Sequence, residues 1–226
     1  RSAAISLPLA YHYDLWRPED APAGPLFVCL HGYGQSKADA LKVGRAIGTG
    51  WPIAALQAPH PHHKLERGRV AGVGFGWVSA FAPEHDIRNH HAFILGVLER
   101  LRAEGVVKQQ RAFLFGFSQS VSLNYRFARA HPEALYGLVA VAGAVPSDWL
   151  AERDKAPLET PVLHLSARAD ASYPPDLAER FRAELGARCR DLTWLEEDGG
   201  HRVPRAAYPK IREWLERVWA RHAGAG

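Results

Sequence analysis

Apolar residues gather in six short runs along the chain, and none of these runs is longer than five residues. Many of their side chains are β-branched or aromatic. Runs of this length and composition predict strands that are buried on both faces, as in a parallel sheet. The runs cover Leu26 to Leu30, Ile53 to Leu56, Ala112 to Phe115, Leu138 to Ala142, Val162 to Leu165 and Leu192 to Leu195.

Stretches with helical spacing separate these runs; in one of them Ile87, Ile94 and Leu98 share a face. Strands that alternate with helices predict βα units with right-handed crossovers. The expected fold is therefore α/β, with a mostly parallel central sheet and helices on both faces. The helices are expected at roughly Ser36 to Ile47, Ile87 to Glu104, Gln119 to Ala130, Pro175 to Leu185 and Tyr208 to Trp219.

The start of the chain and two long connections depart from this alternation. Tyr11, Tyr13 and Leu15 alternate with polar residues, which predicts an edge strand antiparallel to the others. The connections from His60 to Glu84 and from Val145 to Thr160 are expected to be long loops that border a functional site. With 226 residues, the chain fits a single domain over residues 1–226.

Composition narrows the function classes. The net charge of +4 comes from Arg and Lys interleaved with Asp and Glu, a pattern that argues against a nucleic-acid partner. The longest nearly apolar run, Gly137 to Val145, is far shorter than the ~20 residues of a membrane span. Cys29 and Cys189 form no disulfide framework, which favours the cytoplasm. The sequence contains no Met, so a removed signal peptide remains open, as does a homodimer.

One segment carries the signature of an activated nucleophile. The run Ala112 to Phe115 leads directly into Gly116-Phe117-Ser118-Gln119-Ser120 and then into a predicted helix. This strand-turn-helix setting is the nucleophile elbow of the α/β-hydrolase fold, in which a serine hydroxyl is exposed near converging backbone N–H groups. Ser118 is therefore the predicted nucleophile. Ser120 departs from the G-x-S-x-G pattern, and its small side chain is expected to fit.

A serine hydroxyl needs a base, which in this fold follows the nucleophile along the chain. His201 is the candidate, on a loop after the last predicted strand. The other histidines that follow Ser118 have structural explanations: a helix end for His131, a buried strand for His164 and the tail of the chain for His222.

The orienting acid is expected to project from the carboxyl edge of the sheet. Asp170, directly after the fifth predicted parallel strand, is the first choice. Asp198 is the alternative, although only three residues from His201 it would more naturally shape a turn. The order Ser118, Asp170, His201 is the order of α/β-hydrolases.

Acyl transfer also requires donors for the developing oxyanion. The amide of Gln119 supplies one, and the glycine-rich segment Leu30 to Gly34 can turn the amide of Tyr33 toward the site. A dinucleotide-binding reading of this segment fails, because the third glycine is absent and Gln57, not an acid, ends the next strand.

These motifs resemble the carboxylesterase and phospholipase family that includes acyl-protein thioesterases. The resemblance spans roughly residues 26 to 218 and rests on Leu30 to Gly34, Gly116 to Gln119, Asp170 to Pro174 and Gly200-His201. It implies a compact α/β-hydrolase that cleaves small-molecule esters or thioesters without a cofactor, with Ser118, Asp170 and His201 as triad and the amides of Tyr33 and Gln119 as oxyanion hole.

Three alternatives stay open. A peptidase of the prolyl-oligopeptidase type and a dienelactone-type hydrolase share the scaffold, although the latter favours Cys at the position of Ser118. The third is a catalytically weak α/β-hydrolase used for binding, for which Ser120 is the only indication.

Aromatic residues and histidines in the first long connection are further candidates. Phe75, Trp77 and Phe81 are expected either to line an acyl pocket or to close the core beneath the loop. His31 is expected to shape the oxyanion loop. Six other histidines form two clusters, one of His60, His62 and His63 and one of His85, His90 and His91. Their spacing matches no known metal site, so no metal site is predicted. His90 and His91 are expected on the exposed side of a helix.

Overall fold

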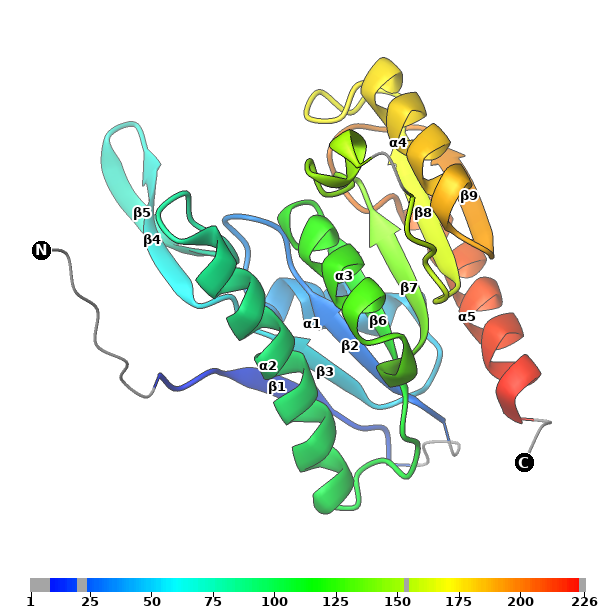
Figure 1. Ribbon diagram of the computed structural model, residues 1–226. Coiled ribbons are helices and arrows are strands. Elements are labelled where there is room, and N and C mark those ends of the chain that lie inside the picture. Colours follow the sequence, from blue (N-terminus) through cyan, green and yellow to red (C-terminus); the bar gives the residue numbers. More distant parts are fainter. Residues whose placement is uncertain (1–8, 20–23, 153–154, 224–226) are drawn as a thin grey trace, which may run out of the picture.

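A seven-stranded sheet forms the centre of the computed structural model, which describes residues 9–19, 24–152 and 155–223 (Figure 1). Six strands are parallel, and only the edge strand β1 runs antiparallel, to β3. The predicted strands and the antiparallel edge are confirmed. The order is β1 (Tyr13–Trp16), β3 (Ile53–Leu56), β2 (Leu26–Leu30), β6 (Ala112–Phe117), β7 (Leu135–Val141), β8 (Val162–Ala167) and β9 (Leu192–Glu197).

Helices cover both faces of this sheet (Figure 1). Helices α2 (Pro83–Ala103), α3 (Gln119–Ala130) and α4 (Pro175–Arg188) lie on one face, and α1 (Lys37–Ile47) and α5 (Tyr208–Ala223) on the other. Helix α3 has its predicted bounds. Helix α2 begins at Pro83 instead of Ile87, because proline suits the first turn of a helix, where its missing N–H costs no hydrogen bond.

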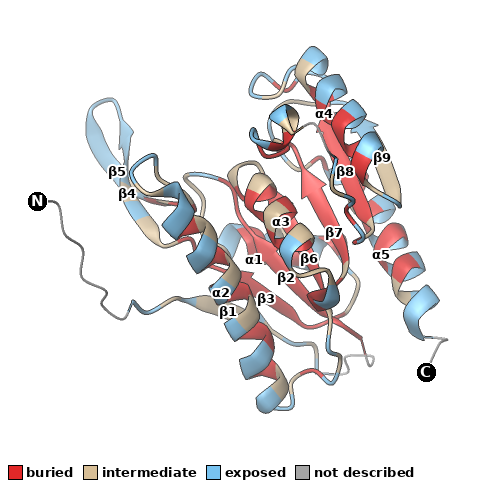
Figure 2. Cartoon of the chain, viewed as in Figure 1, coloured by how far each residue is buried: buried red, intermediate tan, exposed pale blue. Residues whose placement is uncertain are grey.

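Each face of the sheet supports its own hydrophobic core, and Figure 2 shows the buried strands between the helices. Successive side chains of a strand point to opposite faces. Along β6, Leu114 therefore joins the core beneath α2, α3 and α4, whereas Phe113 joins the core beneath α1 and α5. There its ring lies 5.3 Å from that of Trp51 and 6.3 Å from that of Trp214.

The connection from His60 to Glu84 is not a plain loop, and that prediction is wrong. It contains the hairpin of β4 (His60–Glu66) and β5 (Arg69–Gly76), which projects from the body of the protein (Figures 1 and 2). Arg67 and Gly68, with φ of 50° and 76°, form its two-residue turn. Positive φ at both positions is the conformation that matches the twist of paired strands. The exposed strands lack the hydrophobic run from which the other strands were predicted.

The second long connection contains the short 3-10 helix η2 (Trp149–Ala151) and is otherwise irregular over its described residues. The side chain of Trp149 is buried, and the guanidinium of Arg188 lies 5.0 Å from its ring and 2.8 Å from its carbonyl oxygen. Two further 3-10 turns are η1 (Pro132–Ala134) and η3 (Arg205–Ala207). No helix of the described residues is both long enough and apolar enough to cross a membrane.

The expected exposure of His90 and His91 is also wrong. His90 is 3% exposed, and its Nε2–H donates to Asn124 Oδ1 on α3 at 3.1 Å, while His91 is half-buried against Phe127. Helix α2 turns these two histidines toward α3 because its apolar stripe continues on either side of them. Burial lowers the pKa of His90 to about 3 and that of His91 to about 4, so both rings are neutral near pH 7.

Candidate active site

Ser118 lies at a sharp turn between β6 and α3, at the carboxyl edge of the sheet. Its φ of 54° and ψ of −115° lie outside the regions that residues with a side chain ordinarily adopt. Two hydrogen bonds hold this conformation: Ser118 N donates to Val141 O at 3.0 Å, and Val121 N donates to Ser118 O at 3.0 Å. The strained backbone is thus fixed by β7 and by the first turn of α3.

Two glycines allow the chain to approach this turn closely. A Cβ atom at position 116 would lie 2.4 Å from Asn124 Nδ2, and one at position 32 would lie 2.7 Å from Phe117 Cδ1. Neither separation is sterically possible without a shift of the neighbouring group. Gly116 and Gly32 therefore let α3 and the loop after β2 pack against the turn.

Ser120 fits beneath the turn, as expected. Its side chain is buried, and its Oγ accepts a hydrogen bond from Phe117 N at 3.0 Å while donating to Phe117 O, also at 3.0 Å. The hydroxyl satisfies a buried backbone amide that a glycine at this position would leave without that partner. Ser120 therefore supports the turn.

The side chains of Ser118, His201 and Asp170 lie in one hydrogen-bonded chain. His201 Nε2 is 2.9 Å from Ser118 Oγ, and His201 Nδ1 is 2.9 Å from Asp170 Oδ2 and 3.1 Å from Oδ1. A carboxylate only accepts, so Nδ1 carries the ring proton and Nε2 is left to accept from the serine hydroxyl. This tautomer is the one that a general base requires.

Asp170 is itself held in place by the loop after β8. Its side chain is only 1% exposed, and its Oδ1 accepts hydrogen bonds from the amides of Ser172 at 2.8 Å and Tyr173 at 3.1 Å. Asp198, the alternative acid, lies elsewhere: its carboxylate is 92% exposed and pairs with Arg168 at 2.6 Å.

Two aromatic rings flank the imidazole of His201. The ring of Phe117 lies 5.1 Å away and that of Tyr173 5.6 Å away. Burial raises the pKa of the Tyr173 phenol, the charge of Asp170 raises it further, and a hydrogen bond to Ser118 acts in the opposite direction. The Tyr173 hydroxyl is therefore protonated near pH 7. The sequence motifs did not point to this residue, although its place between Asp170 and Pro174 was a signal.

The loop after β2 lies close to this turn, since a Cβ atom at Gly32 would be 3.2 Å from Ser118 Cβ. In this loop Gly32 N donates to Gln35 Oε1 at 2.9 Å and Gly34 N to Phe75 O at 2.9 Å, whereas no acceptor is found among the described residues for the amide of Tyr33. The amide of Gln119, as the first of α3, has no helical partner. Neither of the two amides predicted as oxyanion donors is therefore committed to another acceptor among the described residues, and their role stays a prediction.

His31 ties this loop to the neighbouring strand. Its Nε2 accepts from Ala58 N at 3.1 Å, so its Nδ1 carries the proton and donates to Gly32 O at 2.8 Å. Burial lowers the pKa of His31, which keeps the ring in this neutral form. The expected role of His31 in shaping the loop agrees with these contacts.

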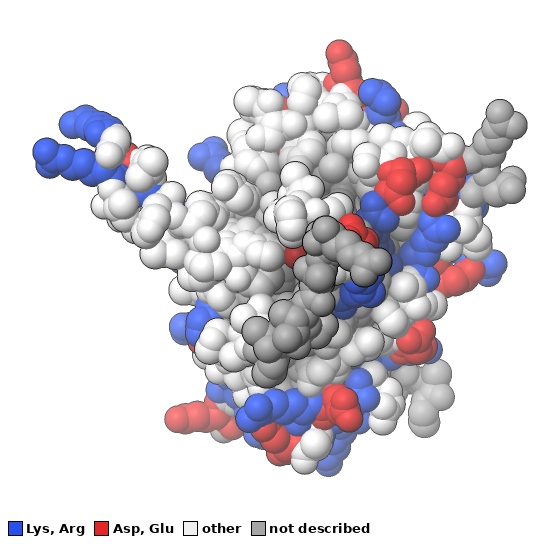
Figure 3. Space-filling model, turned by 60° about the vertical axis from the view of Figure 1, so that its left-hand side comes forward, with Lys and Arg blue, Asp and Glu red and all other residues white. Residues whose placement is uncertain are grey.

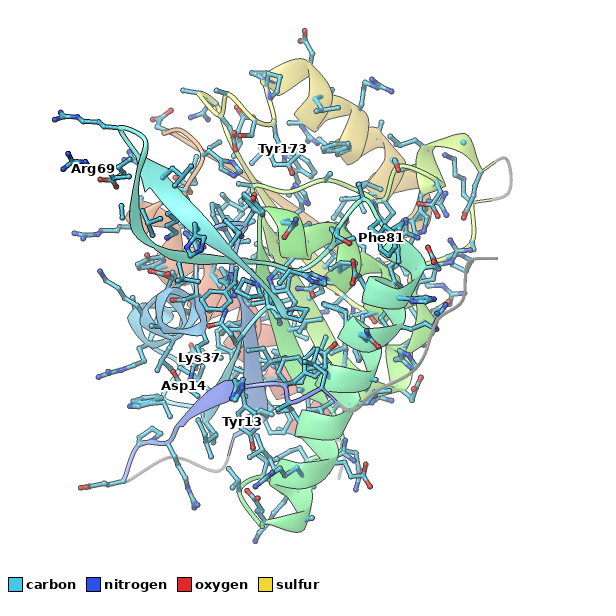
Figure 4. The ribbon with its side chains drawn as sticks, turned by 90° about the vertical axis from the view of Figure 1, so that its left-hand side faces the viewer. Tyr13, Asp14, Lys37, Arg69, Phe81 and Tyr173 are labelled. Carbon is cyan, nitrogen blue, oxygen red and sulfur yellow. The ribbon has the colours of Figure 1, made fainter. Side chains whose placement is uncertain are left out.

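The three aromatic candidates for an acyl pocket occupy different environments. Trp77 is 1% exposed and its Nε1 donates to His31 O at 2.8 Å, so it supports the oxyanion loop from the core. Phe75 is half-buried, and its amide donates to Gln35 O at 3.2 Å. Phe81 is 97% exposed and lies apart from Tyr173, the residue that flanks His201 (Figure 4). The structure does not bring the three together into one pocket.

A cavity of about 520 Å³ lies instead beside His201, between α1 and the segment that leads into α5. Sequence patterns gave no sign of it, because its walls come from four separate segments. The histidine clusters are dispersed: His60 pairs with Asp86 at 2.8 Å, and the ring of His62 stacks on that of Tyr33 at 4.5 Å. Among the described residues, no group of three or more His, Cys, Asp or Glu is placed to hold a metal ion.

Comparison with solved structures identifies the fold. Superposition on a Mesorhizobium loti carboxylesterase gives a TM-score of 0.71 at 18% identity, over 92% of this chain and 95% of the other. The Bacillus cereus carboxylesterase gives 0.68 at 18% identity, over 92% and 94% of the two chains. The fold is that of the α/β-hydrolases. A variant of Arabidopsis thaliana SOBER1 gives 0.65 at 18% identity over 85% of this chain and 99% of that one.

Among curated sequences, the α/β-hydrolase chain is 27% identical over 172 residues to a Nocardia uniformis subsp. tsuyamanensis protein named "Putative esterase NocK". The match covers 73% of this chain and 46% of that protein, so the chain spans about half the length of this relative. No protein-family model matches the chain. The expected resemblance to carboxylesterases is confirmed at the level of the fold.

Proposed function

We propose that this chain is a serine hydrolase that cleaves carboxylic esters or thioesters through an acyl-enzyme. The observation that carries the proposal is the hydrogen-bonded chain from Ser118 through His201 to the buried Asp170. The esterase names of the structural neighbours and of the curated relative agree with it.

In this mechanism Ser118 Oγ attacks the carbonyl carbon while His201 Nε2 takes the hydroxyl proton. Asp170 keeps the imidazole in the required tautomer and stabilises the imidazolium that forms. The amides of Tyr33 and Gln119 bind the oxyanion. His201 then delivers its proton to the leaving alcohol or thiol. A water molecule, deprotonated by the same histidine, then attacks the acyl carbon; the bond from that carbon to Ser118 Oγ breaks, His201 returns the proton to Oγ, and the carboxylic acid leaves.

The test is hydrolysis of a chain-length series of p-nitrophenyl esters by the wild-type protein and by Ser118→Ala. We expect the variant to lose turnover by about 10⁴-fold or more, because the nucleophile acts together with its base. Ser122→Ala, on the same helix, is the matched control and should retain wild-type turnover. Added EDTA should have no effect. Equal turnover by wild type and Ser118→Ala would refute the proposal, and loss of activity on chelation would point to a metal enzyme.

A further inference from the structure

The lining of the cavity beside His201 mixes apolar and polar side chains. Phe117, which directly precedes Ser118, lines it together with His201, Val43 of α1 and Val203. Helices α1 and α5 lie on the same face of the sheet (Figure 1), and the cavity is lined by α1 and by the segment from His201 to Tyr208 that leads into α5. Its volume of about 520 Å³ is within the range of small-molecule sites. A second hollow of about 570 Å³ continues from it past Val203.

Three exposed cations line this cavity: Lys42 from α1, Arg202 next to the base and Arg205 from η3. None of them has an ion-pair partner within the described parts of the chain. One carboxylate, Asp39, also lines the cavity and accepts from Ser36 N at 2.9 Å, while Asp198 of the second hollow pairs with Arg168. With three cations against this one carboxylate, the net charge of the lining is positive, which attracts anionic ligands.

The position of the cavity indicates which part of an ester substrate it could bind, the acyl group or the leaving group. After the attack of Ser118, the base must hand its proton to the heteroatom of the leaving group, which therefore lies on the side of His201. The carbonyl oxygen, by contrast, faces the amides of Tyr33 and Gln119. A cavity walled by His201 itself is thus placed for the leaving group.

We infer that this cavity binds an anionic leaving group, an alcohol or thiol that bears a carboxylate or a phosphate, with Lys42, Arg202 and Arg205 as its recognition residues. The inference rests on the proposed function and adds the substrate class. In the step concerned, the bond from Ser118 Oγ to the acyl carbon forms and the bond from that carbon to the leaving oxygen or sulfur breaks. The proton that His201 took from Ser118 ends on the leaving group, which departs neutral at that atom and anionic at its acidic group.

Paired substrates test this assignment. Two phenyl butyrates differ only at the meta position of the phenol, where one carries a carboxylate and the other a carboxamide; a third carries a phosphate. We expect kcat/KM for the carboxylate or the phosphate ester to exceed that for the carboxamide by about tenfold at low ionic strength. The ratio should fall toward one in about 0.5 M NaCl, because exposed charges are screened.

Variants separate recognition from general surface charge. The double variant Lys42→Gln/Arg205→Gln keeps Arg202, the residue next to His201. It should lower the ratio of kcat/KM for the anionic ester to that for the neutral ester at least fivefold, mainly through KM. Arg217→Gln, an exposed cation on α5 outside the cavity, removes a charge without touching the site and should leave the ratio unchanged. The charge reversal Lys42→Glu/Arg205→Glu should bring the ratio below one.

A direct binding measurement makes the inference independent of turnover. Titration of the Ser118→Ala protein with phenyl phosphate or benzoate should show saturable binding that Lys42→Gln/Arg205→Gln weakens at least fivefold. Equal kcat/KM for anionic and neutral esters, with Ser118-dependent hydrolysis of both, would overturn the inference and leave the proposed function intact. Absence of Ser118-dependent hydrolysis would refute the proposed function, and the binding titration alone would then decide whether the anion site exists.

Discussion

Strand β6 and the β4–β5 hairpin both end near Ser118, and they reach that point in opposite ways. Every residue of β6 is buried between helices, and Ser118 follows its last residue. The hairpin exposes Leu65, Val70 and Val73 to solvent and carries Lys and Arg side chains at its tip (Figures 2 and 3). Its base meets the body of the protein, where His60 pairs with Asp86, His62 stacks on Tyr33 and Phe75 pairs with Gln35.

The comparison shows where each region contributes to the site. Strand β6 holds a strained backbone rigidly, because packing on both faces and the neighbouring strand β7 leave it no freedom. The hairpin contributes through hydrogen bonds at its base, where Phe75 pairs with Gln35 and fixes the loop that carries the Tyr33 amide. Substitutions near Ser118 should therefore have large effects, and those at the hairpin tip small ones.

The largest expected effect belongs to the acid of the hydrogen-bonded chain. Asp170→Asn should lower kcat by about 10⁴-fold, equivalent to about 5.5 kcal/mol, because an amide presents the wrong hydrogen-bond partner to His201 Nδ1. Asp198→Asn is the matched control and should change kcat less than threefold, since its carboxylate is exposed. Steady-state hydrolysis of one ester by both variants measures this. The opposite ranking would make Asp198 the acid.

The second effect concerns stability at acidic pH. Burial lowers the pKa of His90 and of His164 to about 3, against 6.5 in the unfolded chain. Below pH 6.5 these two histidines become protonated in the unfolded chain but stay neutral in the folded protein. The free energy of unfolding therefore falls as the pH drops from 6.5 toward 3. Between pH 6.5 and about 4.5 the two groups together should cost roughly 3 to 5 kcal/mol.

Urea unfolding at several pH values measures this loss. His164→Gln should reduce the pH slope by about a third, because His90 and His91 still contribute, while His63→Gln, on the exposed hairpin, is the control and should leave the slope unchanged. A slope that responds equally to both substitutions would show that burial of His164 is not its cause.

Ser120→Gly should have a moderate effect on stability and little effect on activity. The substitution removes the hydroxyl that satisfies the buried Phe117 amide and adds backbone freedom to the unfolded chain, so the free energy of unfolding should fall by about 2 kcal/mol. Ser120→Ala isolates the loss of the hydroxyl. A tenfold gain in kcat for Ser120→Gly would contradict the supporting role of Ser120 and mark the wild-type turn as impaired.

The smallest effect is expected at the tip of the hairpin. Leu65→Ser and Val70→Ser should each change the free energy of unfolding by less than about 0.5 kcal/mol and leave kcat within twofold, because both side chains are already in solvent. Phe75→Ala, at the base, is the contrast and should lower both stability and kcat. If tip and base substitutions lowered kcat alike, the hairpin would act as a whole.

The sequence predicted the buried elements well because both faces of each strand are covered, which leaves a continuous apolar run such as Leu26 to Leu30. The hairpin was missed for the converse reason: its strands are exposed, and its turn uses Arg67-Gly68 where Asn-Gly is the familiar signal. The burial of His90 has no sign in the sequence, because a polar residue on a helix ordinarily faces water and its partner, Asn124, lies on another helix.

In the candidate site, too, features with a local sequence signal could be predicted and features that depend on packing could not. Ser118, Asp170 and His201 were predictable because chain order and strand ends fix the place of each. Tyr173 and the cavity beside His201 depend on how separate segments pack, for which a single sequence has no local signal.

Covalent labelling with a fluorophosphonate probe, followed by mass spectrometry of the digested protein, tests directly whether Ser118 is an activated nucleophile. The probe reacts with a serine only when a base activates it. We expect a single adduct on the peptide that contains Ser118, with labelling at least 100-fold slower in His201→Ala and absent in Ser118→Ala and in heat-denatured protein. Labelling of another serine, or equal rates in wild type and His201→Ala, would contradict this expectation.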